Sequence, residues 1–110
     1  MSDYVSIKDD VLKKLEANLP EIRERFGIET IGIFGSVARG EDNPDSDVDV
    51  FYTYAEGREH GMFKTVELID FLESLFGREV DFVSFKWMRP MLKKYVEPDM
   101  ITVTAGEVSV

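Results

Sequence analysis

The residues of this chain that could do chemistry are concentrated between Gly35 and Asp49. This stretch reads Gly-Ser-Val-Ala-Arg-Gly-Glu-Asp-Asn-Pro-Asp-Ser-Asp-Val-Asp, and it follows a short apolar run at 31–34. A strand that ends in a Gly-Ser turn exposes backbone amides that can bind a phosphate. The following segment carries two aspartates separated by one residue, and their carboxylates can bind a metal. The stretch therefore predicts a site for a phosphate group and a divalent metal ion.

Asp47 and Asp49 open a predicted strand over 47–54. Because one residue separates them, both side chains leave the same face of that strand. Magnesium prefers oxygen ligands, usually takes one or two carboxylates from a protein, and completes its shell with water and substrate phosphates. Two ions about 3.5–4 Å apart can activate an attacking hydroxyl and stabilise a leaving group. We therefore expect Mg²⁺ at these carboxylates, with two ions as the expected number.

A third carboxylate is expected from Asp81. This residue interrupts the apolar alternation of a predicted strand over 79–85, and that strand is expected to neighbour the one that carries the two aspartates. A buried carboxylate in such a place can also belong to a structural ion pair. The spacing thus favours a metal site of three carboxylates, with the ion pair as the alternative.

Gly35, Ser36 and Arg39 are the candidates for holding the phosphates. A glycine lets the backbone approach closely, the start of the following helix offers unpaired amides, and Ser36 adds a hydroxyl. Arg39 lies one turn later, where its guanidinium can approach the same phosphates. Simpler roles stay open, because Gly35 could be a turn residue, Ser36 a helix cap and Arg39 a surface charge.

The first element that must support this site is an amphipathic helix with Ser6 as its N-cap. Apolar residues recur at spacings of three and four up to Phe26, and Gly27 is expected to end the helix. Pro20 lies inside this pattern, where it removes a backbone donor and clashes with the preceding turn. We therefore expect a kink there, or a break into two helices near Leu19.

The remaining elements follow from the alternation of apolar and polar residues. Strands are predicted over 29–34, 47–54, 79–85 and 100–104. Helices are predicted over 36–40 and 62–76, with a last short helix that tolerates Pro90 in its first turn. This order of helices and strands predicts an α/β (α+β) fold, a small mixed β-sheet flanked by helices.

The composition sets limits on the function. With 110 residues, 44% of them hydrophobic, the chain suits one folded domain over 1–110. Its 22 acidic and 13 basic residues give a net charge of -9, which argues against direct nucleic-acid binding. The sequence contains no cysteine and no apolar run of about 18 residues, so we expect no disulfide and no membrane span. A cytoplasmic location is the expectation.

Four polar residues are predicted to be solvated. Glu41, Asp42 and Asp45 fit an acidic loop in water, and His60 lies in a polar, glycine-flanked connection.

Two apolar groups remain to be placed. The first is predicted to belong to the core and comprises Trp87, Met88, Met91, Leu92 and Tyr95. The second is a stripe on the helix over 62–76, formed by Leu68, Phe71 and Leu75. It fits burial within the domain and burial against a partner protein equally well.

Three segments together resemble the motifs of the minimal nucleotidyltransferases, small members of the polymerase-beta-like superfamily. They are Gly-Ser-Val-Ala-Arg-Gly at 35–40, Ser-Asp-Val-Asp-Val at 46–50 and Val-Asp-Phe-Val at 80–83. All three occur in order, and the resemblance extends from about residue 22 to the C-terminus. It implies the polymerase-beta-like nucleotidyltransferase core and the transfer of a nucleoside monophosphate, usually AMP from ATP, to a hydroxyl with release of pyrophosphate.

The resemblance also implies roles for individual residues. Asp47 and Asp49 would be metal ligands, and Asp81 the third carboxylate and candidate base. Gly35 and Ser36 would hold the triphosphate. Arg39 matches the motif as well, as a further candidate for nucleotide binding.

Many one-domain proteins of this kind resemble the antitoxin half of HEPN/MNT pairs, in which the partner is a helical HEPN ribonuclease. The resemblance implies an antitoxin that neutralises the toxin by adding AMP to a tyrosine hydroxyl, or by binding it. Three hypotheses stay open: Mg²⁺- and ATP-dependent modification of a HEPN ribonuclease, stoichiometric binding without catalysis, and nucleotidyl transfer to a small-molecule hydroxyl such as an aminoglycoside-like acceptor.

Overall fold

The elements of the chain follow one another in an order close to the predicted one. A computed structural model describes residues 4–59 and 61–103. The elements are α1 (Lys8–Phe26), β1 (Ile28–Phe34), α2 (Gly35–Arg39), β2 (Val48–Tyr54), α3 (Met62–Phe76), β3 (Val80–Ser84), α4 (Pro90–Val96), the 3₁₀ helix η1 (Glu97–Asp99) and β4 (Ile101–Thr102). His60 and Thr104, for which predictions were made, lie outside the described residues.

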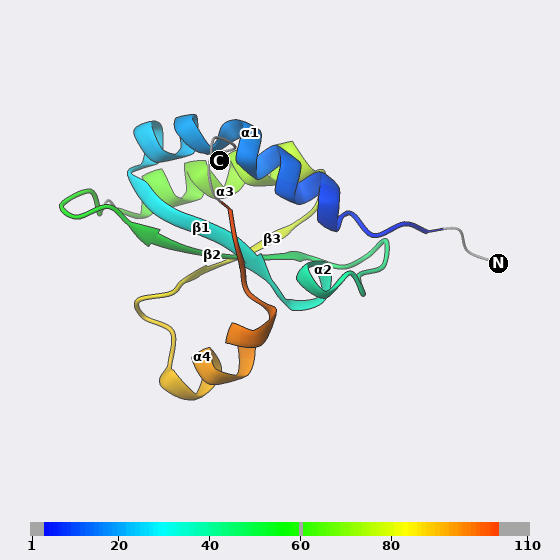
Figure 1. Ribbon diagram of the computed structural model, residues 1–110. Coiled ribbons are helices and arrows are strands. Elements are labelled where there is room, and N and C mark those ends of the chain that lie inside the picture. Colours follow the sequence, from blue (N-terminus) through cyan, green and yellow to red (C-terminus); the bar gives the residue numbers. More distant parts are fainter. Residues whose placement is uncertain (1–3, 60, 104–110) are drawn as a thin grey trace, which may run out of the picture.

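The four strands form one mixed sheet in the order β3-β2-β1-β4. Strand β1 pairs antiparallel with β2 and with β4, whereas β2 pairs parallel with β3. Helices α1 and α3 cover one face of the sheet, and α4 lies on the opposite side (Figure 1). The prediction of a small mixed sheet flanked by helices is therefore confirmed.

Helix α1 packs on the sheet through the apolar residues that define its predicted face. Its buried residues are Val11, Leu15, Leu19, Ile22 and Phe26. The helix continues without interruption past Pro20, so the predicted break into two helices is wrong. Burial of the neighbouring positions 19 and 22 outweighs the single backbone hydrogen bond that a proline removes. The helix ends at Phe26 and is capped by Gly27, which has a φ of 68°, as predicted.

The start of α1 differs slightly from the prediction. The N-cap position is Ile7, one residue after Ser6. The Ser6 hydroxyl oxygen still accepts a hydrogen bond from the Lys8 amide over 3.1 Å.

Helix α3 buries the stripe whose position the sequence left open. Leu68 is fully buried, and Phe71 and Leu75 pack against the same core as α1. This stripe is therefore part of the domain interior. At the beginning of the helix, in contrast, Met62 and Phe63 are 78% and 94% exposed.

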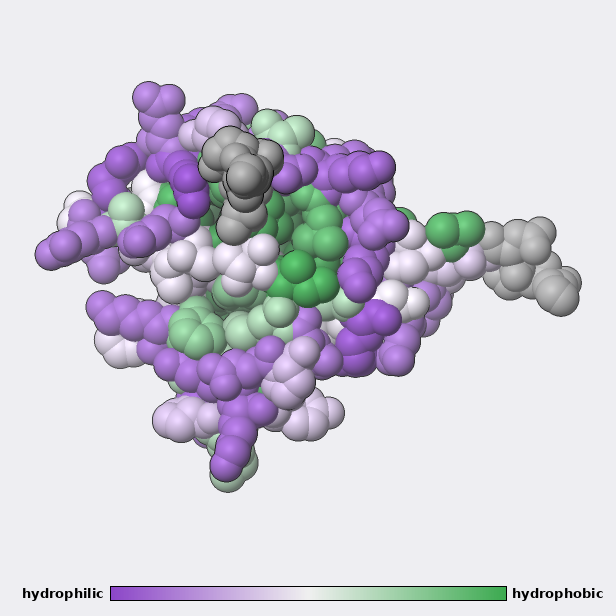
Figure 2. Space-filling view, viewed as in Figure 1, coloured by the Kyte–Doolittle hydropathy of each residue, from purple (hydrophilic) through white to green (hydrophobic). Residues whose placement is uncertain are grey.

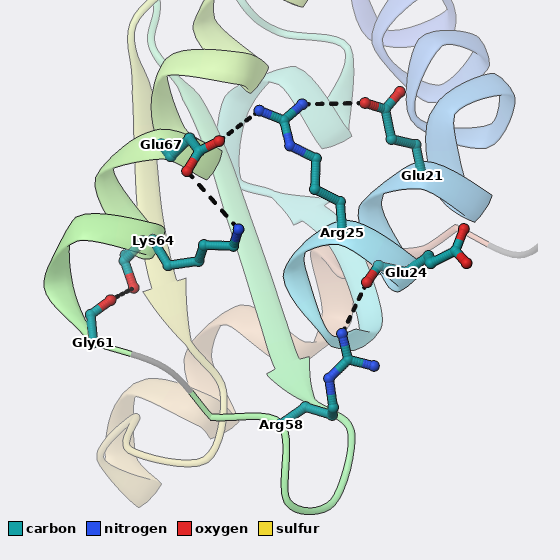
Figure 3. Close-up of polar contacts among 8 residues, drawn as sticks. Glu21, Glu24, Arg25, Arg58, Gly61, Lys64 and Glu67 are labelled. Carbon is teal, nitrogen blue, oxygen red and sulfur yellow. Dashed lines mark hydrogen bonds and ion pairs between the residues drawn. The ribbon is translucent and has the colours of Figure 1, made fainter.

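An ion-pair cluster joins the outer sides of α1 and α3 (Figure 3). The Arg25 guanidinium donates to Glu21 over 3.1 Å and to Glu67 of α3 over 2.6 Å. Arg58, in the connection before α3, donates to the Glu24 carbonyl over 2.8 Å. These contacts fix the two helices and the connection relative to one another at the end of the sheet remote from α2.

The face of the sheet opposite α1 carries a smaller apolar cluster. Its buried members are Phe34, Phe51, Met88 and Val96. Burial of Met88 agrees with the prediction. The prediction is wrong for Trp87, Met91, Leu92 and Tyr95, which are 78%, 85%, 44% and 79% exposed. Helix α4 has only seven residues, and the cluster buries the flanking Met88 and the helix's last residue, so the rest of its apolar side chains point away from the sheet.

Candidate active site

The turn at Gly35 lies directly against one of the candidate metal ligands. Strand β1 ends at Phe34, whose register partner on β2 is Asp49. Gly35 follows with a φ of 76°, and a Cβ built on it would lie 2.1 Å from the Asp49 Oδ2 atom. This position requires glycine for two reasons, since the backbone is left-handed and the carboxylate occupies the space of a side chain. The Gly-Ser turn and the second motif therefore meet in space.

The carboxylates come together through the parallel pairing of two strands. Asp49 and Asp81 are direct register partners on β2 and β3. Val48 and Val50 belong to the core beneath α1 and α3, so the alternating Asp49 side chain points to the opposite face. Asp47 is exposed and lies one residue before β2 begins.

The electrostatics of this group centre on Asp49. Partial burial, together with the charges of Asp81 and Asp47, raises the pKa of the Asp49 carboxyl to about 6, and the charge of Arg39 opposes the shift. A carboxylate that is partly desolvated and faces like charges gains most from a nearby cation. The donor chemistry therefore fits a magnesium ion. In the arrangement of residues 4–59 and 61–103, however, no three carboxylate or imidazole side chains converge closely enough to hold one ion.

Arg39 is engaged by two carboxylates. Its Nε donates to Glu41 and its Nη1 to Asp99 of η1, both over 2.9 Å. The hydrogen bonds that it donates to Glu41 and Asp99 raise the pKa of the Arg39 guanidinium. Its charge also reaches Asp49, whose pKa it lowers. Arg39 thus links α2 to η1 beside the carboxylates, and its binding of phosphate stays a prediction.

Asp42 corrects one prediction, because it is buried rather than solvated. Its side chain is 8% exposed and accepts hydrogen bonds from the hydroxyls of Tyr4 and Ser6 and, over 3.1 Å, from the Ile7 amide. Burial alone would raise the pKa of Asp42, but these hydrogen bonds outweigh it and hold the pKa below its usual value. The other two acids of the loop, Glu41 and Asp45, are exposed as predicted.

Arg78 is a residue near the site that the sequence analysis missed. Its Nη1 donates to the carbonyl oxygens of Asn43 and Ser46 over 3.1 and 2.9 Å, and its Nη2 donates to the Tyr4 hydroxyl over 2.9 Å. It thereby ties the loop before Asp47 to the segment that leads into Asp81. Backbone carbonyls leave no trace in a sequence, and the only available signal was a basic residue directly before a strand in an acidic chain.

Known proteins are similar to this chain over most of its length. The model of the nucleotidyltransferase domain family matches residues 15–103. Protein adenylyltransferase MntA of Thermococcus cleftensis is 37% identical over 95 residues, which cover 86% of this chain and 94% of that protein. A solved structure described as a minimal nucleotidyltransferase is 34% identical, with a TM-score of 0.68 and coverage of 84% and 92% of the two chains.

A more distant solved structure is a complex from Shewanella oneidensis of a tri-AMPylated HEPN toxin with its MNT antitoxin. The matched chain is 20% identical, with a TM-score of 0.55 and coverage of 89% of this chain and 69% of that one. At this identity, the likeness shows the fold alone.

The resemblance of the three sequence motifs is therefore confirmed. The family match spans both the Gly-Ser turn and the paired aspartates, and the relatives cover nearly the whole described chain. This chain belongs to the nucleotidyltransferase domain family and is a minimal nucleotidyltransferase.

Proposed function

We propose that this nucleotidyltransferase is a Mg²⁺-dependent protein adenylyltransferase. It transfers AMP from ATP to a tyrosine hydroxyl of a HEPN ribonuclease and acts as the antitoxin of that toxin. The observation that carries the proposal is the pairing of Asp49 with Asp81 at the point where Gly35 touches the Asp49 carboxylate. Support for a protein acceptor comes from the relative named protein adenylyltransferase, which aligns with most of this chain.

The reaction exchanges the phosphoanhydride bond between the α- and β-phosphates of ATP for a phosphoester bond to the acceptor. The acceptor oxygen forms a bond to the α-phosphorus of ATP, the bond from that phosphorus to the bridging oxygen of the β-phosphate breaks, and pyrophosphate leaves. The proton of the hydroxyl passes to a base, for which Asp81 is the candidate. When bound, Mg²⁺ supplies positive charge that stabilises the negative charge on the transferring phosphoryl group.

The residues of the chain have distinct parts in this scheme. Asp47 and Asp49 hold the metal, and the raised pKa of Asp49 means that its ionisation and cation binding favour each other. Gly35 and Ser36 hold the triphosphate through the close backbone approach that the turn allows. Phosphoryl transfer depends mainly on positioning and charge, and these residues provide both.

The test is transfer of label from ATP labelled at the α-phosphate to the purified cognate HEPN ribonuclease. Asp49→Asn should lower the rate by at least about 100-fold, since a metal ligand accounts for several kcal/mol of charge stabilisation. Asp45→Asn is the matched control, because Asp45 is an exposed acid of the same loop. Unchanged transfer by Asp49→Asn would refute the proposal.

The second candidate is a binding-only antitoxin, and the exposed apolar side chains of α4 favour it. It predicts that a variant with both Asp47→Ala and Asp49→Ala still inhibits the ribonuclease in a stoichiometric complex, with no transfer of AMP by the unaltered chain. Label incorporation into a small hydroxyl compound without any protein present would instead point to a small-molecule acceptor.

A further inference from the structure

Helix α4 and the residue segment before it expose an apolar surface that the reaction chemistry does not explain. We define the α4 surface as Trp87, Arg89, Met91, Leu92, Lys94 and Tyr95. Four of these residues line a groove of about 360 Å³: Arg89, Met91, Leu92 and Tyr95. Large apolar side chains with such exposure, gathered on one helix, mark interaction sites more often than isolated ones do.

The charge of this segment is opposite to that of the chain. Residues 86–95 contain four basic side chains and no acidic one, in a chain with 22 acidic residues and a net charge of -9. Figure 2 shows hydrophilic side chains beside paler and hydrophobic ones over the part of the molecule that α4 forms. The α4 surface is thus a basic and apolar patch on an acidic protein.

The patch lies on the same face of the sheet as the carboxylates. Phe51 follows Asp49 by two residues on β2, about 7 Å along the strand, and it packs with Met88 and Val96 at the two ends of the α4 segment. The ion pair between Arg39 and Asp99 also holds α2 against η1, the continuation of α4. The helix that carries the α4 surface is therefore packed on the carboxylate-bearing face of the sheet, and its continuation η1 is joined to α2.

We propose that the α4 surface docks the acceptor protein through a patch of acidic and apolar side chains on that protein. This inference rests on the proposed function, since it concerns how the acceptor hydroxyl reaches the carboxylates. Apolar contact supplies affinity, and charge complementarity sets the orientation and speeds the encounter.

A protein patch suits the surface better than other acidic partners. Charges are screened over about 8–10 Å at physiological ionic strength, so an acidic patch seated on the α4 surface meets mainly Arg89 and Lys94. A long polyanion such as RNA extends past the patch and meets the acidic remainder of the chain. A second copy of the chain is disfavoured as well, because a two-fold contact would place like charges against each other.

The only tryptophan of the chain reports directly on this surface. Trp87 is 78% exposed, so binding at the α4 surface should shift and quench its emission. Two probes are used: the purified cognate HEPN ribonuclease, and a random copolymer of glutamate and tyrosine, which combines acidic groups with aromatic hydroxyls. We expect both to alter the emission and to bind more weakly as salt concentration rises.

Charge reversal tests the electrostatic part. The variant R89E/K94E should weaken binding of both probes by about tenfold or more, because attraction becomes repulsion at two positions. The matched control is K13E/R23E, which reverses two exposed basic residues of α1. It should leave the Kd within about twofold.

Serine substitutions test the apolar part. M91S/Y95S should weaken ribonuclease binding by about tenfold or more, and M62S/F63S at the start of α3 should not. Both pairs replace side chains that are at least 78% exposed, so the thermal midpoint of each variant should match that of the unaltered chain. ATP binding, measured without the acceptor protein, should be unchanged in all four variants.

The possible outcomes separate the docking surface from the proposed function. If R89E/K94E binds both probes within twofold of the unaltered chain, the docking proposal fails. It also fails if an oligouridylate binds more tightly than the protein probes, or if the chain forms dimers that M91S/Y95S abolishes. Binding through the α4 surface without AMP transfer would refute the proposed function alone. AMP transfer that the α4 variants do not impair would refute the docking surface alone.

Discussion

Replacing Gly35 with alanine should disable the site while leaving the chain folded. The left-handed backbone at this position disfavours any residue with a side chain by about 1–2 kcal/mol. The new Cβ would lie 2.1 Å from the Asp49 Oδ2 atom, whereas such contacts are essentially never shorter than 3.0 Å, so the carboxylate must move by roughly 1 Å. A displacement of this size at a reacting centre can lower a rate by about 100-fold.

The variant Gly40→Ala separates the cost of a left-handed backbone from the displacement of the Asp49 carboxylate. Gly40 also has a left-handed backbone, with a φ of 73°, but a Cβ there would meet no atom within 4 Å. Both variants should lose about 1–2 kcal/mol of unfolding free energy in urea titrations. Only Gly35→Ala should also lose AMP transfer to the ribonuclease, measured with ATP labelled at the α-phosphate. Transfer rates for the two variants that agree within about threefold would refute this account of Gly35.

Three further predictions concern charges around the site. Because the folded-state pKa of Asp49 is raised to about 6, its contribution to stability is present below the unfolded pKa near 3.8 and is lost as pH rises through 6. With a chelator at pH 7, Asp49→Asn should therefore raise the unfolding free energy, by about 1 kcal/mol after allowance for solvent screening. In urea titrations, a gain in unfolding free energy on Asp49→Asn that is no larger at pH 7 than at pH 4 would contradict this. The contribution of Asp42 to stability changes with pH in the opposite direction. Because its pKa is lowered, its stabilisation is present at neutral pH and is lost as pH falls through the folded-state pKa. Asp42→Asn should cost about 1–3 kcal/mol at pH 7 and less at pH 3, and an equal cost at both pH values would refute the role of the charge. Arg78→Gln should release the carbonyls of Asn43 and Ser46 and speed amide hydrogen exchange in residues 42–47, with Arg23→Gln on the outside of α1 as the control. Unchanged exchange in that loop would show that Arg78 does not fix it.

The sequence alone determined the order of the elements and the residues that share a face. Periodicity is a local property, so the spacing of Asp47 and Asp49 and the apolar stripe of α1 could be read without any knowledge of the fold. The three motifs, taken together, also indicated the family that the comparisons show. The pairing of Asp49 with Asp81 was expected because the two predicted strands were expected to be neighbours, and the register confirms it.

Only the tertiary structure decided which of these faces are covered. A stripe of apolar residues shows that one side of a helix can pack, but the neighbouring segments decide whether anything packs there. Leu68 is buried for this reason, whereas Met91 is exposed. The same applies to Asp42, whose hydrogen-bond donors lie 35–38 positions away in the sequence, and to Pro20, where packing on the sheet keeps α1 continuous. Local patterns therefore indicated the candidate site residues, while long-range contacts determined what surrounds them.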